Sequence, residues 1–144
     1  MNIKVQRLND LAQLPTIGSQ YSAGFDLYAA IEAPVEIAPH TTEKIGTGLA
    51  FELPEQTFAG IFARSGLATK QGLRPANCVG ICDSDYRGEY IVAIYNDSDV
   101  ARVVQPGDRI AQMILLPYIP MEFTEVDELT TTERGDGGFG STGV

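Results

Sequence analysis

The segment Ala63–Ala68 brings together residue types that bind anions. It follows a β-type run and opens the best helix candidate, Ser65–Gly72, whose first backbone N–H groups lack partners within the helix. Arg64 supplies a forked donor, Ser65 a hydroxyl, and Gly66 lets a phosphate approach the main chain. A capped helix beside a surface arginine fits the same residues, so this segment alone leaves both interpretations open.

Acidic and aromatic side chains meet in residues 80–89, which we expect to form a hairpin between two β-type runs. Asp83, Asp85 and Tyr86 would stand at its tip, and loop residues held on a rigid sheet often carry function. A solvated turn is the alternative, because Asp, Ser and Gly favour turns. That alternative does not account for Tyr86, an aromatic residue beside two carboxylates.

Two further runs carry isolated polar side chains. Asp26 is the one acid in the apolar run 22–30, and a buried carboxylate there needs a cationic partner. Arg109 and Gln112 follow a turn at 107–108 and lie three positions apart in an expected strand. They should therefore face opposite ways, and at most one of them should reach a ligand.

The C-terminal tail, Arg134–Val144, contains five glycines in its last ten residues. Such a segment does not order by itself, because fixing glycine costs the most backbone entropy. A frayed terminus is the plain alternative. However, Arg134, Phe139 and the Ser-Thr pair that follows are suitable ligands for phosphates and a base, so we expect a flexible strap that binds them.

The elements that must position these residues are mostly short strands. Many short β-type runs between prolines and glycines favour an antiparallel sandwich or barrel over a βαβ fold. One short helix should be capped by Ser65 and ended by Gly72. The expected strands are Ile3–Arg7, Gly24–Ala30, Val35–Ile37, Glu43–Leu53, Phe58–Ala63, Asn77–Asp83, Glu89–Asn96, Ala101–Val104 and Arg109–Tyr118.

The composition narrows the partners and the location. Ten basic and 19 acidic residues give a net charge of −9, which argues against a nucleic-acid polymer as partner. No run approaches the roughly 18 apolar residues of a membrane span. Residues 1–7 lack the apolar stretch of a secretory signal, so we expect no membrane partner and a cytoplasmic location.

The two cysteines and the single histidine limit redox and metal chemistry. If their segment is a strand, Cys78 and Cys82 lie roughly 13 Å apart, too far for a disulfide. We therefore expect two small core residues. His40 is the one histidine of the chain, which excludes His-rich zinc sites.

Taken in order along the chain, these five segments resemble the five motifs of the trimeric dUTPase family. The resemblance runs from near Ser22 to Val144. Three of the motifs are unbroken: Arg64-Ser65-Gly66, Asp83-Ser84-Asp85-Tyr86-Arg87-Gly88, and the tail from Arg134-Gly135 to Thr142-Gly143.

The resemblance implies an all-β, jelly-roll-like β-barrel with one short helix. It also implies a homotrimer in which a C-terminal arm reaches a neighbouring subunit. The activity would be hydrolysis of dUTP to dUMP and pyrophosphate, which keeps uracil out of DNA and supplies dUMP for thymidylate synthesis. Residues 1–133 would form the barrel domain and residues 134–144 a flexible glycine-rich lid. One subunit would supply Asp83, a second Arg64-Ser65-Gly66, and a third its tail.

Residue roles follow from the same resemblance. Asp83 would be the general base that orients a water for in-line attack on the α-phosphorus. Asp26 would contact Mg²⁺ on the triphosphate through water, and Tyr86 would pack beneath the deoxyribose and leave no room for a 2′-hydroxyl. The other substrate contacts would come from Arg64, Ser65, Gly66, Asn77, Gly80, Ile81, Cys82, Ile91, Gln112, Arg134, Phe139, Gly140, Ser141 and Thr142.

Two departures from the family pattern and two rival functions stay open. Cys82 stands where an aliphatic residue is expected, and Asp136 places a negative charge in the tail. A deoxycytidine-triphosphate deaminase would share the fold, but it would need a glutamate base that no motif here supplies. A non-catalytic nucleotide-sensing module is the second rival, against which the intact Asp83 and Arg64 argue.

Overall fold

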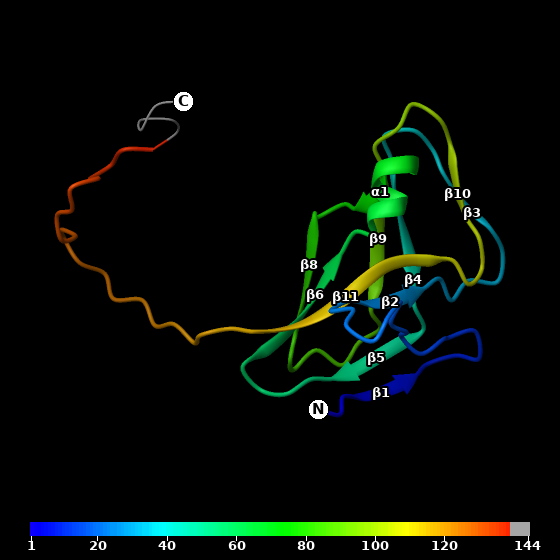
Figure 1. The fold of residues 1–144 in the computed structure, drawn as a ribbon, viewed down its shortest axis with the longest axis horizontal. Coiled ribbons are helices and arrows are strands. Elements are labelled where there is room, and N and C mark those ends of the chain that lie inside the picture. The colour runs from blue at the N-terminus through cyan, green and yellow to red at the C-terminus, as the bar shows by residue number, and fades with distance from the viewer. Residues whose placement is uncertain (139–144) are drawn as a thin grey trace.

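The computed structural model describes residues 1–138, over which short strands and one helix alternate with tight turns (Figure 1). Every strand pairing is antiparallel. The elements are β1 Lys4–Arg7, β2 Phe25–Tyr28, β3 Val35–Ile37, β4 Thr42–Gly46, β5 Leu49–Glu52, β6 Thr57–Phe62, α1 Ser65–Gln71, β7 Leu73–Pro75, β8 Val79–Asp83, β9 Ile91–Asn96, β10 Arg102–Val104 and β11 Arg109–Pro117.

Within the described residues the strands form four small sheets around one apolar core. The largest has the order β2-β11-β6-β8, the next β4-β9-β7, and two-stranded pairs β1-β5 and β10-β3 complete the layers. The fold is jelly-roll-like, as the sequence predicts. Side chains from several sheets are fully buried in the core, among them Leu27, Ile37, Ile45, Leu49 and Leu73.

The expected strand Glu43–Leu53 is wrong, because it is two strands. The chain turns at Gly48, whose φ of +65° is a conformation that glycine adopts without strain. Beside it the buried Thr47 hydroxyl donates to the Tyr90 carbonyl at 2.7 Å. Strand β7 was not expected, since three residues ending in a proline give little strand signal.

The expected hairpin over residues 80–89 is also wrong. Strand β8 pairs with β6, whereas β9 pairs with β4 and β7. Residues 84–90 therefore connect two different sheets and do not close a two-stranded ladder. Two adjacent β-type runs specify strands, but they do not specify which partner each strand takes.

The helix lies where expected, but its cap differs. Gly72 ends α1 in the left-handed region at φ +71°, as predicted. Arg64, not Ser65, is the N-cap residue, and no side-chain hydrogen bond caps this end. Ser65 is the first helical residue, so its hydroxyl does not serve the helix as a cap.

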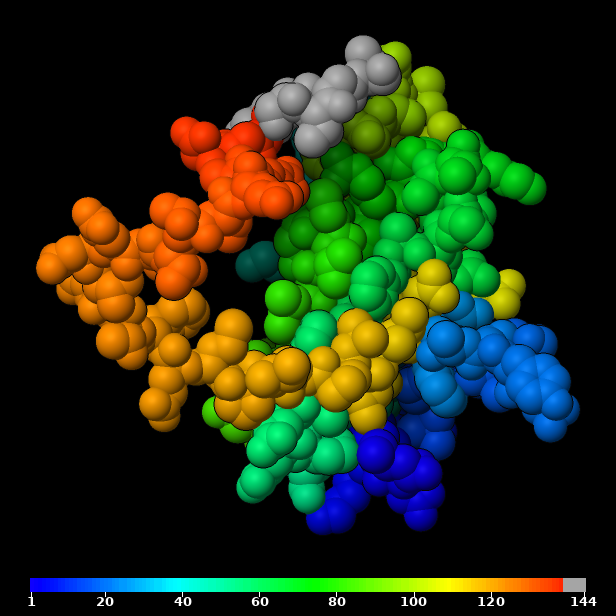
Figure 2. Space-filling view, turned by 60° about the vertical axis from the view of Figure 1, so that its left-hand side comes forward, coloured from blue at the N-terminus to red at the C-terminus, as the bar shows by residue number. Residues whose placement is uncertain are grey.

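After β11 the chain leaves the body as an extended arm of residues 118–138, drawn in orange in Figure 1. Figure 2 shows part of this arm standing clear of the sheets. Large apolar side chains of the arm are exposed at Ile119, Met121 and Phe123. Over residues 1–138, no helix has the length and apolar character needed to cross a membrane.

Both cysteines are free thiols. The expectation of two core residues is wrong for Cys78, which is exposed and lies before β8 with a φ of +63°. Cys82 lies in β8 and is half-buried. Burial raises the pKa of the Cys82 thiol, which keeps this sulfur neutral and poorly nucleophilic.

Candidate functional site

Asp26, which lies on β2, binds two arginine side chains. Its Oδ1 accepts from Arg64 Nε at 2.7 Å, and its Oδ2 accepts from Arg109 Nη1 at 3.2 Å. The Asp26 side chain is 13% exposed, so this carboxylate has the cationic partners that the sequence required. The Asp26 carboxylate thereby holds two guanidinium groups close to each other. Arg64 comes just before α1, and Arg109 is the first residue of β11.

A register shift in β11 brings Arg109 to this cluster. Gln112 is the direct register partner of Asp26, and the pairing shifts between Arg109 and Ala111. This bulge changes the face on which Arg109 stands. The expectation that Arg109 and Gln112 face opposite ways is therefore wrong, since both line one hollow.

That hollow, which we call the arginine hollow, is open and has a volume of about 440 Å³. On one wall the Gln112 side chain donates from Nε2 to the Ala63 carbonyl at 2.9 Å and so braces the residue before Arg64. Gly24 admits the Gln112 carboxamide, which a Cβ at that position would overlap. The lining residues are Gly18, Ser22, Ala23, Gly24, Asp26, Arg64, Ser65, Gly66, Arg109, Gln112 and Ile114.

A second group of predicted residues lies at the far end of β8. Asp83 is the last residue of that strand and pairs with Phe58 at the start of β6. Its backbone carbonyl accepts from Tyr86 N at 3.2 Å, which forms a turn and holds Tyr86 close by. Asp83 is exposed, and within residues 1–138 no hydrogen bond to its carboxylate is formed. This carboxylate is free to bind a water.

Tyr86 is held by the connector that follows β8. Its hydroxyl donates to the Glu89 carbonyl at 3.1 Å, and 46% of the residue is exposed. The Glu89 side chain accepts from Gly48 N at 2.7 Å, so the connector is fastened to the β4–β5 turn. No local pattern indicates Glu89, because its role depends on a contact 41 residues away in the chain.

Four more of the predicted residues lie in or next to β8 and β9. Ile81 in β8 and Ile91 in β9 are exposed apolar residues. A Cβ at Gly80 would lie 3.2 Å from the Ile61 Cβ and 3.5 Å from the Asn77 amide nitrogen, so this position suits glycine. The expected hairpin would place Ile91 across a ladder from Gly80 and Ile81. This is wrong, because β8 and β9 belong to different sheets.

The two groups lie apart within one chain. Arg64 lies two residues after Phe62, the last residue of β6, whereas Asp83 pairs with Phe58 near the start of that strand. Phe62 and Phe58 are four positions apart in β6. Four strand residues span roughly 13 Å. One chain therefore presents an anion-binding hollow and a carboxylate-bearing connector as separate surfaces.

The tail residues are described only in part. Arg134 donates from Nε to the Gly137 carbonyl at 2.8 Å within the arm. Asp136 also lies in the described part of the arm and is exposed. The predicted contacts at Phe139, Gly140, Ser141 and Thr142 lie outside the described residues.

The residues present do not build a metal cage. Over residues 1–138, no three His, Cys, Asp or Glu side chains gather as a set of metal ligands. Both Asp26 oxygens already accept from guanidinium groups. Direct coordination of a metal by Asp26 would therefore have to displace an arginine, whereas a hydrated Mg²⁺ that enters with phosphate oxygens would not need an open carboxylate.

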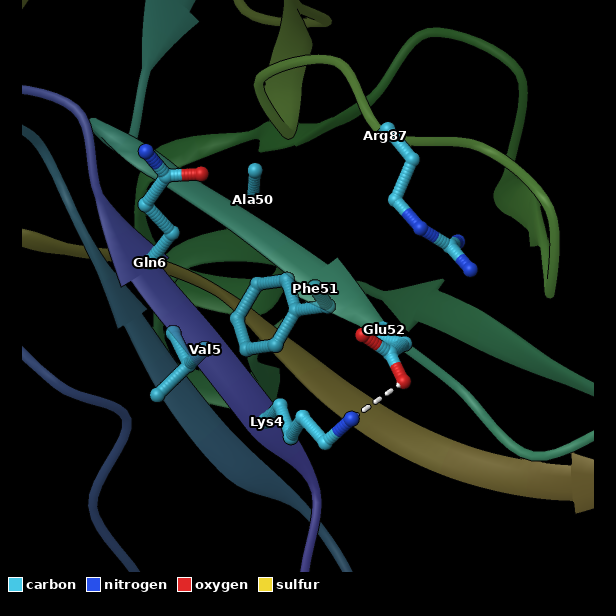
Figure 3. Close-up of a pocket in the computed structure, with 7 residues that line it drawn as sticks. All are labelled: Lys4, Val5, Gln6, Ala50, Phe51, Glu52 and Arg87. Atoms are coloured by element: carbon cyan, nitrogen blue, oxygen red, sulfur yellow. Dashed lines mark hydrogen bonds and ion pairs between the residues drawn. The ribbon is translucent and has the colours of Figure 1, made fainter.

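Another hollow lies between β1, β5 and the connector (Figure 3). None of the predicted site residues lines it, although Arg87, which follows Tyr86, does. Lys4 Nζ and Glu52 Oε1 lie 2.7 Å apart across its mouth. The Lys4 ammonium lowers the pKa of the Glu52 carboxyl. Because both side chains are exposed, this pair contributes little to stability.

Comparison with known proteins supplies independent findings. The family model described as dUTPase matches residues 10–143. A deoxyuridine 5′-triphosphate nucleotidohydrolase of Desulfitobacterium hafniense is 49% identical over 145 residues, covering 100% of this chain and 96% of that protein. The enzyme of the same name from Photorhabdus laumondii is 45% identical over 138 residues, covering 95% and 91%.

A solved structure has the same fold. The dUTPase of Staphylococcus bacteriophage 80alpha with dUPNHPP superposes with a TM-score of 0.91 at 27% identity. The superposition covers 99% of this chain and 99% of that one. Similarity therefore extends over the whole length in both sequence and fold.

Proposed function

The chain belongs to the dUTPase family, and we propose that it hydrolyses dUTP to dUMP and pyrophosphate with a water that Asp83 orients. It is a dUTP diphosphatase, an enzyme of nucleotide metabolism. The observation that carries the mechanism is the pairing of a two-arginine hollow with an exposed, unbonded carboxylate. The first suits a polyphosphate, and the second suits a water nucleophile.

On the phosphate side, we assign Arg64, Ser65, Gly66 and Gln112 to the triphosphate. A phosphate oxygen entering the arginine hollow meets Arg64, which Asp26 already holds in place at 2.7 Å. The Arg64 fork is preorganised by that pair, so less side-chain entropy is lost on binding. Gly66 has open space where a Cβ would stand, which lets a phosphate approach the backbone.

The chemical step needs one base and one fixed geometry. Asp83 accepts a proton from the water as its oxygen attacks the α-phosphorus, the bond from that phosphorus to the bridging oxygen breaks, and pyrophosphate leaves. General-base help supplies roughly 10²–10⁴ in rate. Positioning and charge neutralisation by the arginines must supply most of the remainder.

For base and sugar, we assign the surface where β8 and β9 diverge. Asn77, Gly80, Ile81, Cys82 and Ile91 would surround uracil. Within the described residues β8 is the edge strand of its sheet, so the backbone groups on its outer side have no ladder partner and could bind the base. Tyr86, exposed beside Asp83, would pack beneath the deoxyribose and exclude a 2′-hydroxyl.

Because the two surfaces of one chain lie apart, we propose that copies of the chain share each site in a homotrimer. One copy would supply Asp83 and Tyr86, and its neighbour the arginine hollow. A third would supply residues 134–144 as a lid, with Arg134, Phe139, Gly140, Ser141 and Thr142 on the nucleotide. Support comes from the extended arm, which carries exposed apolar side chains away from its own body.

Mg²⁺ would enter with the triphosphate and neutralise part of its charge. Asp26 would meet the hydrated ion through water, in place of one arginine contact. The excess of acidic residues argues against a nucleic-acid polymer as substrate. We place the reaction in the cytoplasm, where free nucleotides are made.

A substrate panel tests this function. Pyrophosphate release should be rapid with dUTP and Mg²⁺ and slow with dCTP, dTTP and UTP. Ammonia release from dCTP would instead identify a deaminase. Binding of dUTP without any product would identify a non-catalytic sensing module.

A further inference from the structure

Tyr90 is a buried aromatic residue next to the proposed sugar site, and it has no role in the proposed reaction. It is the last residue of the connector before β9 and is 2% exposed. Its ring lies 4.6 Å from the Phe51 ring, tilted by 49°. It also stacks on Tyr86, with 6.1 Å between ring centroids and 28° between planes. The three rings form a column from the core to the surface.

The base of this column is fixed to the sheets. Tyr90 N donates to the Leu49 carbonyl at 2.8 Å, and the Tyr90 carbonyl accepts from the fully buried Thr47 hydroxyl at 2.7 Å. Tyr90 therefore cannot shift without moving the β4–β5 turn. By contrast, the Tyr86 backbone is bonded only within its own connector, to the Asp83 carbonyl and the Arg87 guanidinium, and its hydroxyl donates to the Glu89 carbonyl.

The hydroxyl of Tyr90 does not account for its position. It is buried and forms no hydrogen bond within the described residues, with the Cys82 thiol as a polar neighbour. Leaving a buried hydroxyl without a partner is unfavourable. The useful part of Tyr90 is consequently its ring, which a phenylalanine would supply equally well.

The hydroxyl end of the Tyr86 ring is also confined. A Cβ at Gly88 would overlap the Tyr86 hydroxyl and ring. Gly88 therefore lies against the hydroxyl end of Tyr86, and the Tyr90 ring stacks on it. A change at either contact should shift the exposed Tyr86 ring.

We propose that Tyr90 is a positioning residue that sets discrimination against a 2′-hydroxyl by holding the Tyr86 ring in place. This inference rests on the proposed function, in which Tyr86 packs beneath the sugar. Without the Tyr90 ring, Tyr86 gains room to tilt, and the space that excludes a ribonucleotide opens. The selectivity for dUTP over UTP then depends on a residue that touches neither substrate.

The test measures kcat/KM for dUTP and for UTP in the full-length protein. Tyr90→Leu keeps an apolar side chain but removes the ring, and Tyr90→Met fills the same space more adaptably if the leucine variant does not fold. Both variants should lower the ratio of kcat/KM for dUTP to kcat/KM for UTP by roughly 2- to 10-fold. This fold-change corresponds to the loss of one aromatic pair interaction. Tyr90→Phe should keep the wild-type ratio, since it keeps the ring.

Gly88→Ala separates the inference from the function beneath it. This variant displaces Tyr86 directly and should also lower the ratio. If Gly88→Ala lowers the ratio but folded Tyr90→Leu or Tyr90→Met does not, Tyr90 has no positioning role. An equal loss in Tyr90→Phe would overturn the proposal as well, because the hydroxyl would then be responsible. If Gly88→Ala leaves the ratio unchanged, the assignment of Tyr86 to the sugar is wrong.

Discussion

At the scale of single residues, the site depends on side chains whose positions are set by others. Asp26 binds both Arg64 and Arg109, so removal of one carboxylate would release two guanidinium groups. Asp83, by contrast, is the last residue of β8, and its side chain is exposed. The phosphate-binding side of the site is therefore rigid before substrate arrives, whereas the base is accessible to solvent.

We expect Asp83→Asn to lower kcat by about 10²–10⁴ while dUTP still binds, because the amide keeps the shape but cannot accept the proton. Single-turnover pyrophosphate release and equilibrium dUTP binding measure the two effects separately. Asp85→Asn is the matched control, since it changes the same charge two residues away. Full activity in Asp83→Asn would mean that another group is the base.

Gly24→Ala should lower kcat/KM for dUTP by about tenfold, since a displaced contact near a reacting group costs of the order of 1.4 kcal/mol. Its Cβ would overlap the Gln112 carboxamide, which braces Ala63 before Arg64. Gly18→Ala is the control in the same hollow, where a Cβ would meet only an ordinary contact at 3.8 Å. Equal kinetics in the two variants would show that the Gln112 brace is dispensable.

At the scale of elements, the positions of strands follow from the sequence better than their partners do. Prolines and glycines mark the ends of most strands, and Gly72 ends α1 because its left-handed φ suits glycine. The register shift between Arg109 and Ala111, which places Arg109 beside Asp26, could not be predicted from the local sequence. A bulge depends on the neighbouring strand, so no local pattern predicts it.

The same reason explains the wrong hairpin and the missed residues. The run before Asp83 and the run after Glu89 have strong β-character, yet each pairs elsewhere. The motif residues Arg64, Asp83 and Tyr86 were identified from sequence because their types are chemically distinctive. Glu89 and Tyr90 were not, because their roles arise from contacts with the β4–β5 turn and with Phe51.

One buried amide joins three parts of the fold. Asn96 is fully buried, and its Nδ2 donates to the carbonyls of Ile37, Ala38 and Val100. Asn96→Ala should lower the free energy of unfolding by about 2–4 kcal/mol, because buried acceptors lose their donor. Urea denaturation measures this loss, and the exposed Asn2→Ala is the control. A change below about 0.5 kcal/mol would contradict the importance of this network.

At the scale of the whole molecule, the arm and the body have different character. The body buries its apolar residues in one core, whereas the arm exposes Ile119, Met121 and Phe123. Exposed apolar side chains in an extended segment are typical of a surface that another chain covers. A site shared between copies would explain both this arm and the separation of Asp83 from the arginine hollow.

Deletion of residues 134–144 should reduce dUTP turnover strongly but leave the oligomer intact, because the apolar part of the arm remains. Sedimentation gives the oligomeric state, and pyrophosphate release gives the turnover. Replacement of the tail by an equally long Gly-Ser segment controls for length. Monomers after deletion would contradict the assignment of these residues to a lid.

The central claim is that one copy's Asp83 acts on a nucleotide held by another copy's Arg64. Two inactive variants, Asp83→Asn and Arg64→Gln, can be unfolded together and refolded as a mixture, and dUTP turnover measured. If the copies assemble at random, about a quarter of all sites in the mixture would combine an intact Asp83 with an intact Arg64, since each is present in half of the copies. We predict recovery of about a quarter of wild-type turnover per site. No recovery, with mixed trimers demonstrated, would contradict a shared site.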